Sequence, residues 1–226
     1  MIVLLGTAGA ILAAGIFAQL PALWRQAGAE DRSAAARPAR PRPSRLVLLG
    51  AVALLVAFAE DVPSTWSAVY VEDGLGASAG LAASAYVAFL STMTAGRLIN
   101  DRLVERFGAA LVMRTQAAVF VAALVGVALS QHPALAIAAF ALAGLGVSIL
   151  VPAVLAAAGA HSEESTAGNL AFVTWVGRVG FLIAPVVVGA VAGHTQLGVG
   201  ILLGAVAGLL LMALAGPLTR GSSDSA

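Results

Sequence analysis

The feature that most constrains this chain is its series of long apolar runs, which only short polar segments interrupt. An α-helix needs about 20 mostly apolar residues to cross the hydrocarbon core of a bilayer, so this chain has room for about seven such spans. Transmembrane β-strands would instead alternate apolar and polar side chains over about ten residues. The sequence therefore predicts an all-α polytopic membrane protein with about seven transmembrane helices.

Composition agrees with a place in the membrane and excludes several chemistries. Hydrophobic residues make up 60% of the chain and charged residues only 10%, whereas soluble domains carry about 25% charged residues. The chain has no cysteine and no lysine, which rules out disulfides, thiolate metal sites and Schiff bases with retinal or pyridoxal phosphate. No catalytic triad, phosphate loop or zinc signature is present. We expect no enzyme activity, no cofactor, no metal and no nucleic-acid partner.

The apolar runs and the polar segments between them divide the chain into four parts. Residues 1–24 form a lone transmembrane helix; its apolar core begins at Ile2, which argues against a signal peptide, because that needs a basic region first. Residues 25–45 are rich in arginine and proline and form a linker that cannot bury a core. Residues 46–218 form a six-helix bundle, and 219–226 a disordered tail. We place the six spans at 46–70, 77–96, 109–130, 134–158, 167–192 and 198–218.

The arginines indicate the orientation of the chain in the membrane. If the spans alternate, every arginine except Arg178 falls on one side, in the 25–45 linker, around residues 97–114 or in the tail. Arginine excess marks cytoplasmic loops. We therefore expect the linker and the C-terminus to be cytoplasmic and the N-terminus to lie outside the plasma membrane.

A compact charged segment at residues 96–108 follows the second span of the bundle. Its sequence, GRLINDRLVERFG, has the form G-R-x-x-x-D-R-x-x-x-R-x-G. This segment, two helices into a six-helix unit that a basic linker precedes, resembles the corresponding segment of the major facilitator superfamily. Residues 59–70, AEDVPSTWSAVY, are also similar to helix seven of a bacterial subgroup, in which an acidic residue precedes W-S-A-x-Y.

The resemblance implies a fold of two six-helix halves joined by a cytoplasmic linker. Residues 46–218 would correspond to helices seven to twelve and residues 2–24 to helix six, so most of an N-terminal half is not in this chain. To explain the missing N-terminal half, we prefer a gene fragment or a wrongly assigned start to a deliberate half of a split system. The expected partners are a missing N-terminal half or a second copy of the chain.

The resemblance also implies a function, namely secondary transport of a small solute by alternating access. The alternative is a seven-helix receptor or sensor without a covalent chromophore, which would share the same topology. Its bundle would not be expected to carry an arginine-rich linker after the first helix.

In the family, the charged segment acts as a conformational latch between the halves. The alternative is that its charges only mark the membrane surface. The glycine lies five residues before Asp101, whereas the family pattern has four. The residues that the resemblance assigns to the latch are Gly96, Arg97, Asp101, Arg102, Arg106 and Gly108.

Two adjacent acids, Glu60 and Asp61, lie well inside the first bundle span, just before Pro63. About 21 Å of helix separates Glu60 from Leu46, which places both acids in the outer part of the bilayer. Acids inside a membrane are functional candidates by default, here for proton coupling or for binding a cationic or polyhydroxy solute. The alternative is a structural role or a side chain that reaches the outer loop.

Arg178 is the one arginine expected near the middle of the membrane. An unpaired arginine there costs about 2.5–3.5 kcal/mol on insertion scales, so we expect Glu60 or Asp61 to be its partner. It could bind an anionic solute group, tune the carboxylates, or join two helices.

Three further residues are candidates for contact with the solute. Trp66 and Tyr70 are four residues apart and share a helix face near the outer surface, where an interfacial aromatic belt is the simpler interpretation and stacking against a sugar-like ligand the alternative. Asn169 is a polar residue in the span that carries Arg178 and a weaker candidate for the cavity.

Overall fold

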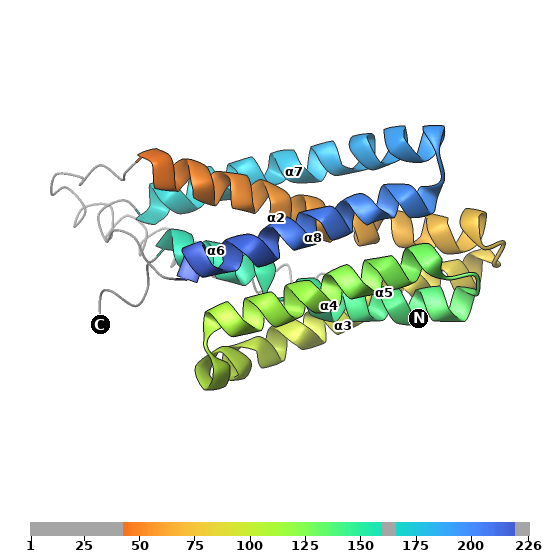
Figure 1. Cartoon of the computed structure of the whole chain (residues 1–226), viewed down its shortest axis with the longest axis horizontal. Helices are drawn as coiled ribbons and strands as arrows, with labels where there is room; N and C mark the ends of the chain where they lie inside the picture. The colour runs from red at the N-terminus through yellow and green to blue at the C-terminus, as the bar shows by residue number, and fades with distance from the viewer. Residues whose placement is uncertain (1–42, 160–165, 220–226) are drawn as a thin grey trace, which may run out of the picture. The chain divides into compact units, whose positions relative to one another are not determined.

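A computed structural model describes residues 43–159 and 166–219, all of which belong to one unit, Arg40–Ala226. The lone span predicted at 1–24, nearly all of the linker and most of the tail lie outside these residues. Within them the chain is helical and contains no strand (Figure 1). The elements are α2 (Pro43–Val69), a π-helical turn η1 (Tyr70–Gly74), α3 (Ala79–Phe107), α4 (Ala109–Leu129), α5 (Pro133–Val147), α6 (Leu150–Gly159), α7 (Thr166–His194) and α8 (Leu197–Thr219).

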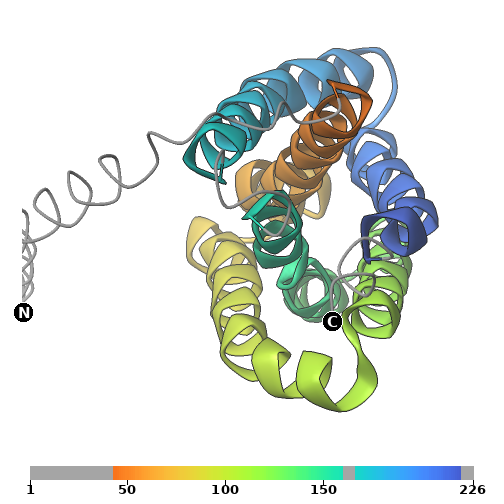
Figure 2. The same cartoon turned by 90° about the vertical axis from the view of Figure 1, so that its left-hand side faces the viewer.

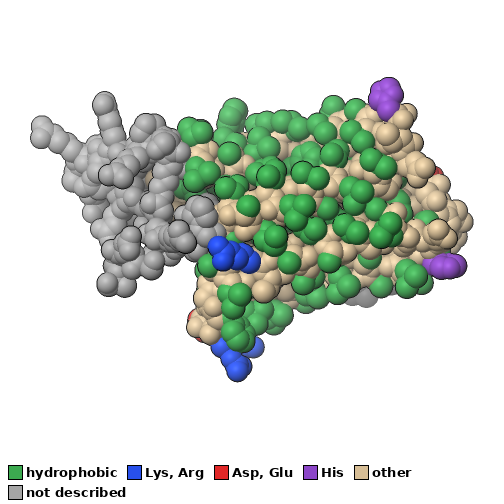
Figure 3. All heavy atoms as spheres, in the orientation of Figure 1, with side chains coloured by type: hydrophobic (Ala, Val, Ile, Leu, Met, Phe, Trp, Pro, Cys, Tyr) green, Lys and Arg blue, Asp and Glu red, His purple; other side chains and the backbone are tan. Residues whose placement is uncertain are grey.

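Six stretches of the described residues are long and apolar enough to cross a membrane, as the sequence predicts. They are Leu46–Gly74, Ala79–Phe107, Ala109–Leu129, Pro133–Gly159, Gly168–His194 and Leu197–Ala215. Figure 3 shows apolar side chains covering the visible face between the two ends, with arginines at one end and histidines at the other. The chain is a polytopic helical membrane protein.

The second span differs from its prediction because the charged segment is helical. Sequence reasoning ends this span at residue 96, but α3 continues through the charged residues to Phe107. Arginine, leucine and glutamate are good helix formers, so the charges extend the helix instead of ending it. The turn into α4 is Gly108 alone, with φ of 81°, a left-handed conformation that suits glycine. We call this end of the bundle the arginine end, because Arg102, Arg106 and Arg114 lie on these two helices near their junction.

The fourth span consists of α5 and α6, with a break at Ser148 and Ile149. Pro152 explains the position of the break, since it has no N–H to donate to the carbonyl of Ser148, four residues earlier, and its ring crowds that carbonyl.

The six spans form two sets of three whose contacts match. The first span packs on the fifth (α2 on α7), and the fourth span packs on the second (α5 on α3). The first also packs on the sixth (α2 on α8), and the fourth on the third (α5 on α4), while α4 packs on α8. Exchanging the first three spans for the last three leaves this pattern unchanged (Figure 2). Because each set has an odd number of spans, the second set enters the membrane from the opposite side, which makes it an inverted repeat.

Glycine allows the tightest of these contacts. A Cβ on Gly144 of α5 would collide with the carbonyl oxygen of Phe89 on α3, and a Cβ on Gly146 would lie 2.5 Å from the backbone nitrogen of Phe120 on α4. Small residues let helix backbones approach closely where lipid provides no hydrophobic drive for association. The buried rings of Phe89, Phe120 and Phe140 fill the space between these helices.

Candidate functional site

An ion pair joins α2 to α3 inside the membrane-spanning region. Glu60 Oε1 lies 3.1 Å from Arg97 Nη2, and the side chains are 14% and 38% exposed respectively. The span that carries Glu60 runs from Leu46 to Gly74, with Glu60 at its midpoint. The second carboxylate oxygen of Glu60, Oε2, is buried and has no hydrogen-bond partner among the described residues.

The partner of Glu60 differs from the one that we expected. Sequence reasoning paired Arg178 with Glu60 or Asp61, but Glu60 pairs with Arg97, and Asp61 Oδ2 accepts a hydrogen bond from Thr65 Oγ1 on its own helix (3.1 Å). The reason is the length of α3. Because this helix continues past residue 96, Arg97 is held within α3, from which it reaches Glu60 on α2.

A cavity of about 420 Å³ lies between α2, α6 and α7, next to this ion pair along α2. Val56 and Ala57 line the cavity and precede Glu60 by one helical turn, so they share its helix face. The cavity therefore continues the face that carries the carboxylate. Its lining consists of Ala53, Val56, Ala57, Val151, Val154, Leu155, Val173, Thr174, Gly177, Arg178 and Phe181.

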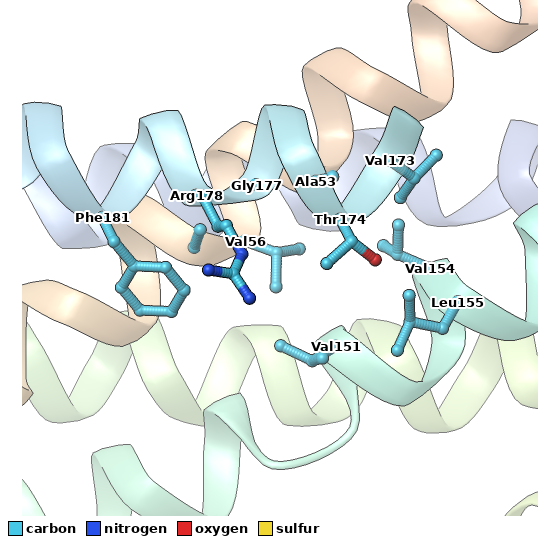
Figure 4. A pocket seen from close by; sticks show the side chains of 11 residues that line it. Ala53, Val56, Val151, Val154, Leu155, Val173, Thr174, Gly177, Arg178 and Phe181 are labelled. Carbon is cyan, nitrogen blue, oxygen red and sulfur yellow. The ribbon is translucent and has the colours of Figure 1, made fainter. Parts of the chain in front are cut away.

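Arg178 supplies the only charge of this lining. Figure 4 shows its guanidinium extending from α7 toward Val56 and Val151. In the parts of the chain that the structure describes, no carboxylate forms an ion pair with it. An arginine in this position costs about 2.5–3.5 kcal/mol on insertion scales if it has no partner. The guanidinium therefore faces a cavity in which a bound anion could neutralise its charge.

A buried polar network connects three helices near the arginine end. Asn100 Nδ2 of α3 donates to Ser148 Oγ (3.0 Å), Ser148 Oγ donates to Gln116 Oε1 of α4 (3.0 Å), and Gln116 Nε2 donates to Asn100 Oδ1 (2.5 Å). Gln116 Oε1 also accepts the backbone N–H of Ile149 (3.2 Å), at the break between α5 and α6. The network thus holds the chain at the break between α5 and α6 against α3 and α4.

Sequence reasoning missed this network, although each member left a signal. Gln116 is a polar residue within the apolar run 109–130, and Ser148 is one within 134–158. Asn100 was concealed among the charges of residues 96–108. Polar side chains inside spans pair with one another, so the sequence could have named these three residues as candidates for pairing, without saying that they meet.

The residues of the predicted latch lie in three different settings. Gly96 is buried where α3 meets Ser148, and Arg97 makes the ion pair with Glu60. Asp101, Arg102 and Arg106 are exposed at the arginine end, and the Arg106 guanidinium lies 5.3 Å from the centre of the Phe107 ring. Gly108 forms the turn that follows.

The remaining candidates do not line the α2–α6–α7 cavity. Tyr70 is buried and is not part of a surface belt: its hydroxyl donates to the carbonyl of Val127 (2.7 Å) and its ring meets Phe140 edge-on. Trp66 packs against Gly189 of α7, and Asn169 is buried, with 4% exposure.

Two inverted sets of three spans define a class of polytopic helical membrane protein that includes many secondary transporters. Residues 49–224 match the Major Facilitator Superfamily, and the chain belongs to it. Membership in this family favours solute transport over the receptor alternative.

The chain is similar to two curated bacterial membrane proteins. It is 28% identical to the membrane protein MosC of Rhizobium meliloti, over 70% of this chain and 39% of MosC. It is 31% identical to an uncharacterised MFS-type transporter of Yersinia pestis, over 74% of this chain and 43% of that protein. The chain thus spans about two fifths of the length of these relatives.

A solved structure shares the fold. It is the peptide transporter POT, crystallised in complex with alafosfalin, with a TM-score of 0.68 and 19% identity. The match covers 84% of this chain and 42% of POT. This likeness concerns the fold alone.

Proposed function

We propose that residues 43–219 form one half of a secondary transporter, which moves a small solute across the plasma membrane by alternating access, and that the Glu60–Arg97 pair is its coupling site. The observation that carries the proposal is a carboxylate at the midpoint of a span, paired through one oxygen only. Protonation of Glu60 would cancel its attraction for Arg97 and release α2 from α3. Both groups could then change partners as the solute binds.

Other unpaired polar atoms of α2 support a polar site near Glu60. Trp66 Nε1 and Ser67 Oγ are buried and lack a hydrogen-bond partner within the described residues, like Glu60 Oε2. A buried polar atom without a partner costs about 1–3 kcal/mol. Water or a solute can satisfy these atoms, and for this reason we retain Glu60, Asp61 and Trp66 as candidates for coupling or solute contact. Tyr70 and Asn169 remain weaker candidates that would act through packing.

The exposed residues at the arginine end fit a latch that acts on a partner. Asp101, Arg102 and Arg106 point outward from the end of α3 and make no ion pair with another described residue. We infer that they contact an N-terminal half, or a second copy of this chain, on the cytoplasmic side. Gly96, Arg97 and Gly108 would fix the helix that presents them, and the N-terminus would lie outside.

The function can be tested in membrane vesicles from the source organism, with and without this gene, so that any partner half encoded elsewhere is present. Uptake driven by an imposed pH gradient is measured for amino acids, dipeptides, sugars and carboxylates. Uptake of at least one class should be lost on deletion, restored by the chain, lost again with Glu60→Gln and retained with Glu72→Gln, a change at an exposed acid outside the site. If deletion alters no uptake, the proposal is wrong.

A further inference from the structure

The α2–α6–α7 cavity combines one positive charge with walls that are otherwise almost entirely apolar. Arg178 and Thr174 provide its polar side chains, and they lie one helical turn apart on the same face of α7. Val56, Val151, Val154 and Phe181 are prominent among its apolar walls (Figure 4). Its volume of about 420 Å³ falls within the range of about 300–1,000 Å³ that is usual for small-molecule sites.

Backbone packing brings the guanidinium to this cavity. Gly180 of α7 lies so close to α2 that a Cβ there would be 2.5 Å from the carbonyl oxygen of Leu54. The neighbouring Gly177 also faces α2, near Ala53. Because α7 meets α2 through these glycines, Arg178 projects into the space between α2 and α6 instead of into a helix interface.

Neither acid of the neighbouring helix forms an ion pair with Arg178. Glu60 pairs with Arg97, and Asp61 accepts a hydrogen bond from Thr65. The cavity lining contains no acid. A cationic solute would meet an uncompensated positive charge here, and a sugar would find too few polar groups for its hydroxyls.

We propose that this cavity binds an amphipathic organic anion, which places a carboxylate, sulfonate or phosphonate on Arg178 and an apolar body against the valines and Phe181. The planar guanidinium offers parallel N–H groups that match such an anion bidentately. The Thr174 hydroxyl, one turn away, can donate a further hydrogen bond. The inference extends the proposed function by naming its solute class.

Binding to the purified full chain in neutral detergent tests the class of ligand. The probes are 4-phenylbutyrate, its neutral amide, the cationic 4-phenylbutylamine, and acetate, which has the charge without the apolar body. Isothermal titration should show binding of 4-phenylbutyrate at least tenfold tighter than binding of any of the other three. Equal binding of the amide would overturn the proposal, because Arg178 would then contribute nothing.

Variants test the residues. Arg178→Gln should weaken binding of 4-phenylbutyrate at least tenfold, Arg178→Lys should retain part of it, and Thr174→Val should weaken it severalfold. Arg114→Gln removes an exposed arginine outside the cavity and should change nothing. Val154→Trp fills the cavity without altering charge and should also abolish binding, which keeps the test decisive if Arg178→Gln fails to fold. Full binding by folded Arg178→Gln would refute the site.

An anionic lipid has the same chemistry as the proposed ligand, and nanodiscs separate the two sources. In phosphatidylcholine discs and in discs with added phosphatidylglycerol, 4-phenylbutyrate should bind with the same affinity if the site serves a free solute. Loss of binding on addition of phosphatidylglycerol would overturn a free solute and assign the site to lipid.

The binding test and the transport test fail independently. If uptake depends on the gene but is unchanged by Arg178→Gln, an anionic solute at this cavity would be refuted. The proposal that the chain is part of a transporter would still stand. If the purified chain binds 4-phenylbutyrate but deletion of the gene alters no uptake, the anion site would be supported and the transport function refuted.

Discussion

Replacing Arg97 with glutamine tests how strongly the Glu60–Arg97 pair holds α2 against α3. The variant leaves the Glu60 carboxylate at the midpoint of its span without a cation. Removal of one partner from a fully buried pair costs about 3–5 kcal/mol. Here Glu60 is 14% exposed, but Arg97 is 38% exposed, so solvent already screens part of the attraction. We therefore expect a loss of about 2–3 kcal/mol in the free energy of unfolding.

The measurement is reversible unfolding in mixed micelles of dodecyl sulfate and a neutral detergent, followed by circular dichroism. A double-mutant cycle with Glu60→Gln isolates the pair, because the double variant has no buried charge left unpaired. Its stability should exceed that of Arg97→Gln, with a coupling energy of about 1–2 kcal/mol. Arg114→Gln, at an exposed site, should stay within about 0.5 kcal/mol of the parent chain. Additive single effects would refute the reasoning, since the two side chains would then be energetically independent.

Three further substitutions test the packing of the bundle by the same unfolding measurement. Gln116→Leu leaves Asn100 Oδ1 and the N–H of Ile149 without their partner and should cost about 1–3 kcal/mol, whereas the exposed Gln131→Leu should be neutral; equal effects would mean that the network contributes nothing. Gly144→Ala places a methyl group against the carbonyl of Phe89 and should cost about 1–3 kcal/mol, and no loss would show that α3 and α5 can separate freely. Tyr70→Phe removes the hydrogen bond to the Val127 carbonyl and should cost about 0.5–1.5 kcal/mol; an unchanged stability would mean that water replaces the hydroxyl.

The architecture was predictable from the sequence because, in a membrane, the length of each apolar run is enough to identify a spanning helix. Every backbone group in a span must be paired internally, so a run of about 20 apolar residues has only the helix available to it. The six predicted spans of the bundle therefore correspond to six observed spans. The largest discrepancy is at Arg97, where a change of polarity was interpreted as the end of a helix. The polarity of a segment indicates its depth in the membrane, whereas the end of a helix depends on backbone conformation. Here the helix ends at Gly108, whose positive φ departs from helical geometry.

The pairing of charges was not predictable, because it depends on which helix faces each residue. Glu60 and Asp61 are adjacent in sequence, yet one contacts α3 and the other its own helix. Two neighbouring positions on a helix differ by about 100° in direction, and the sequence does not state which direction points to α3 and which to α7. The network of Asn100, Gln116 and Ser148 was missed for the same reason, since its members come from separate spans.

The distribution of charge around α2 gives the strongest link between the fold and the proposed function. The carboxylate of Glu60 faces α3 and is neutralised within the unit by Arg97. Arg178, on α7, lines the neighbouring cavity, whose lining contains no acid. If Arg178 had taken Glu60 as its partner, the pair would have joined α2 to α7 and left Arg97 free on α3. Because Glu60 pairs with Arg97, Arg178 has no ion-pair partner among the described residues, and the proposed anionic solute would supply one in the cavity.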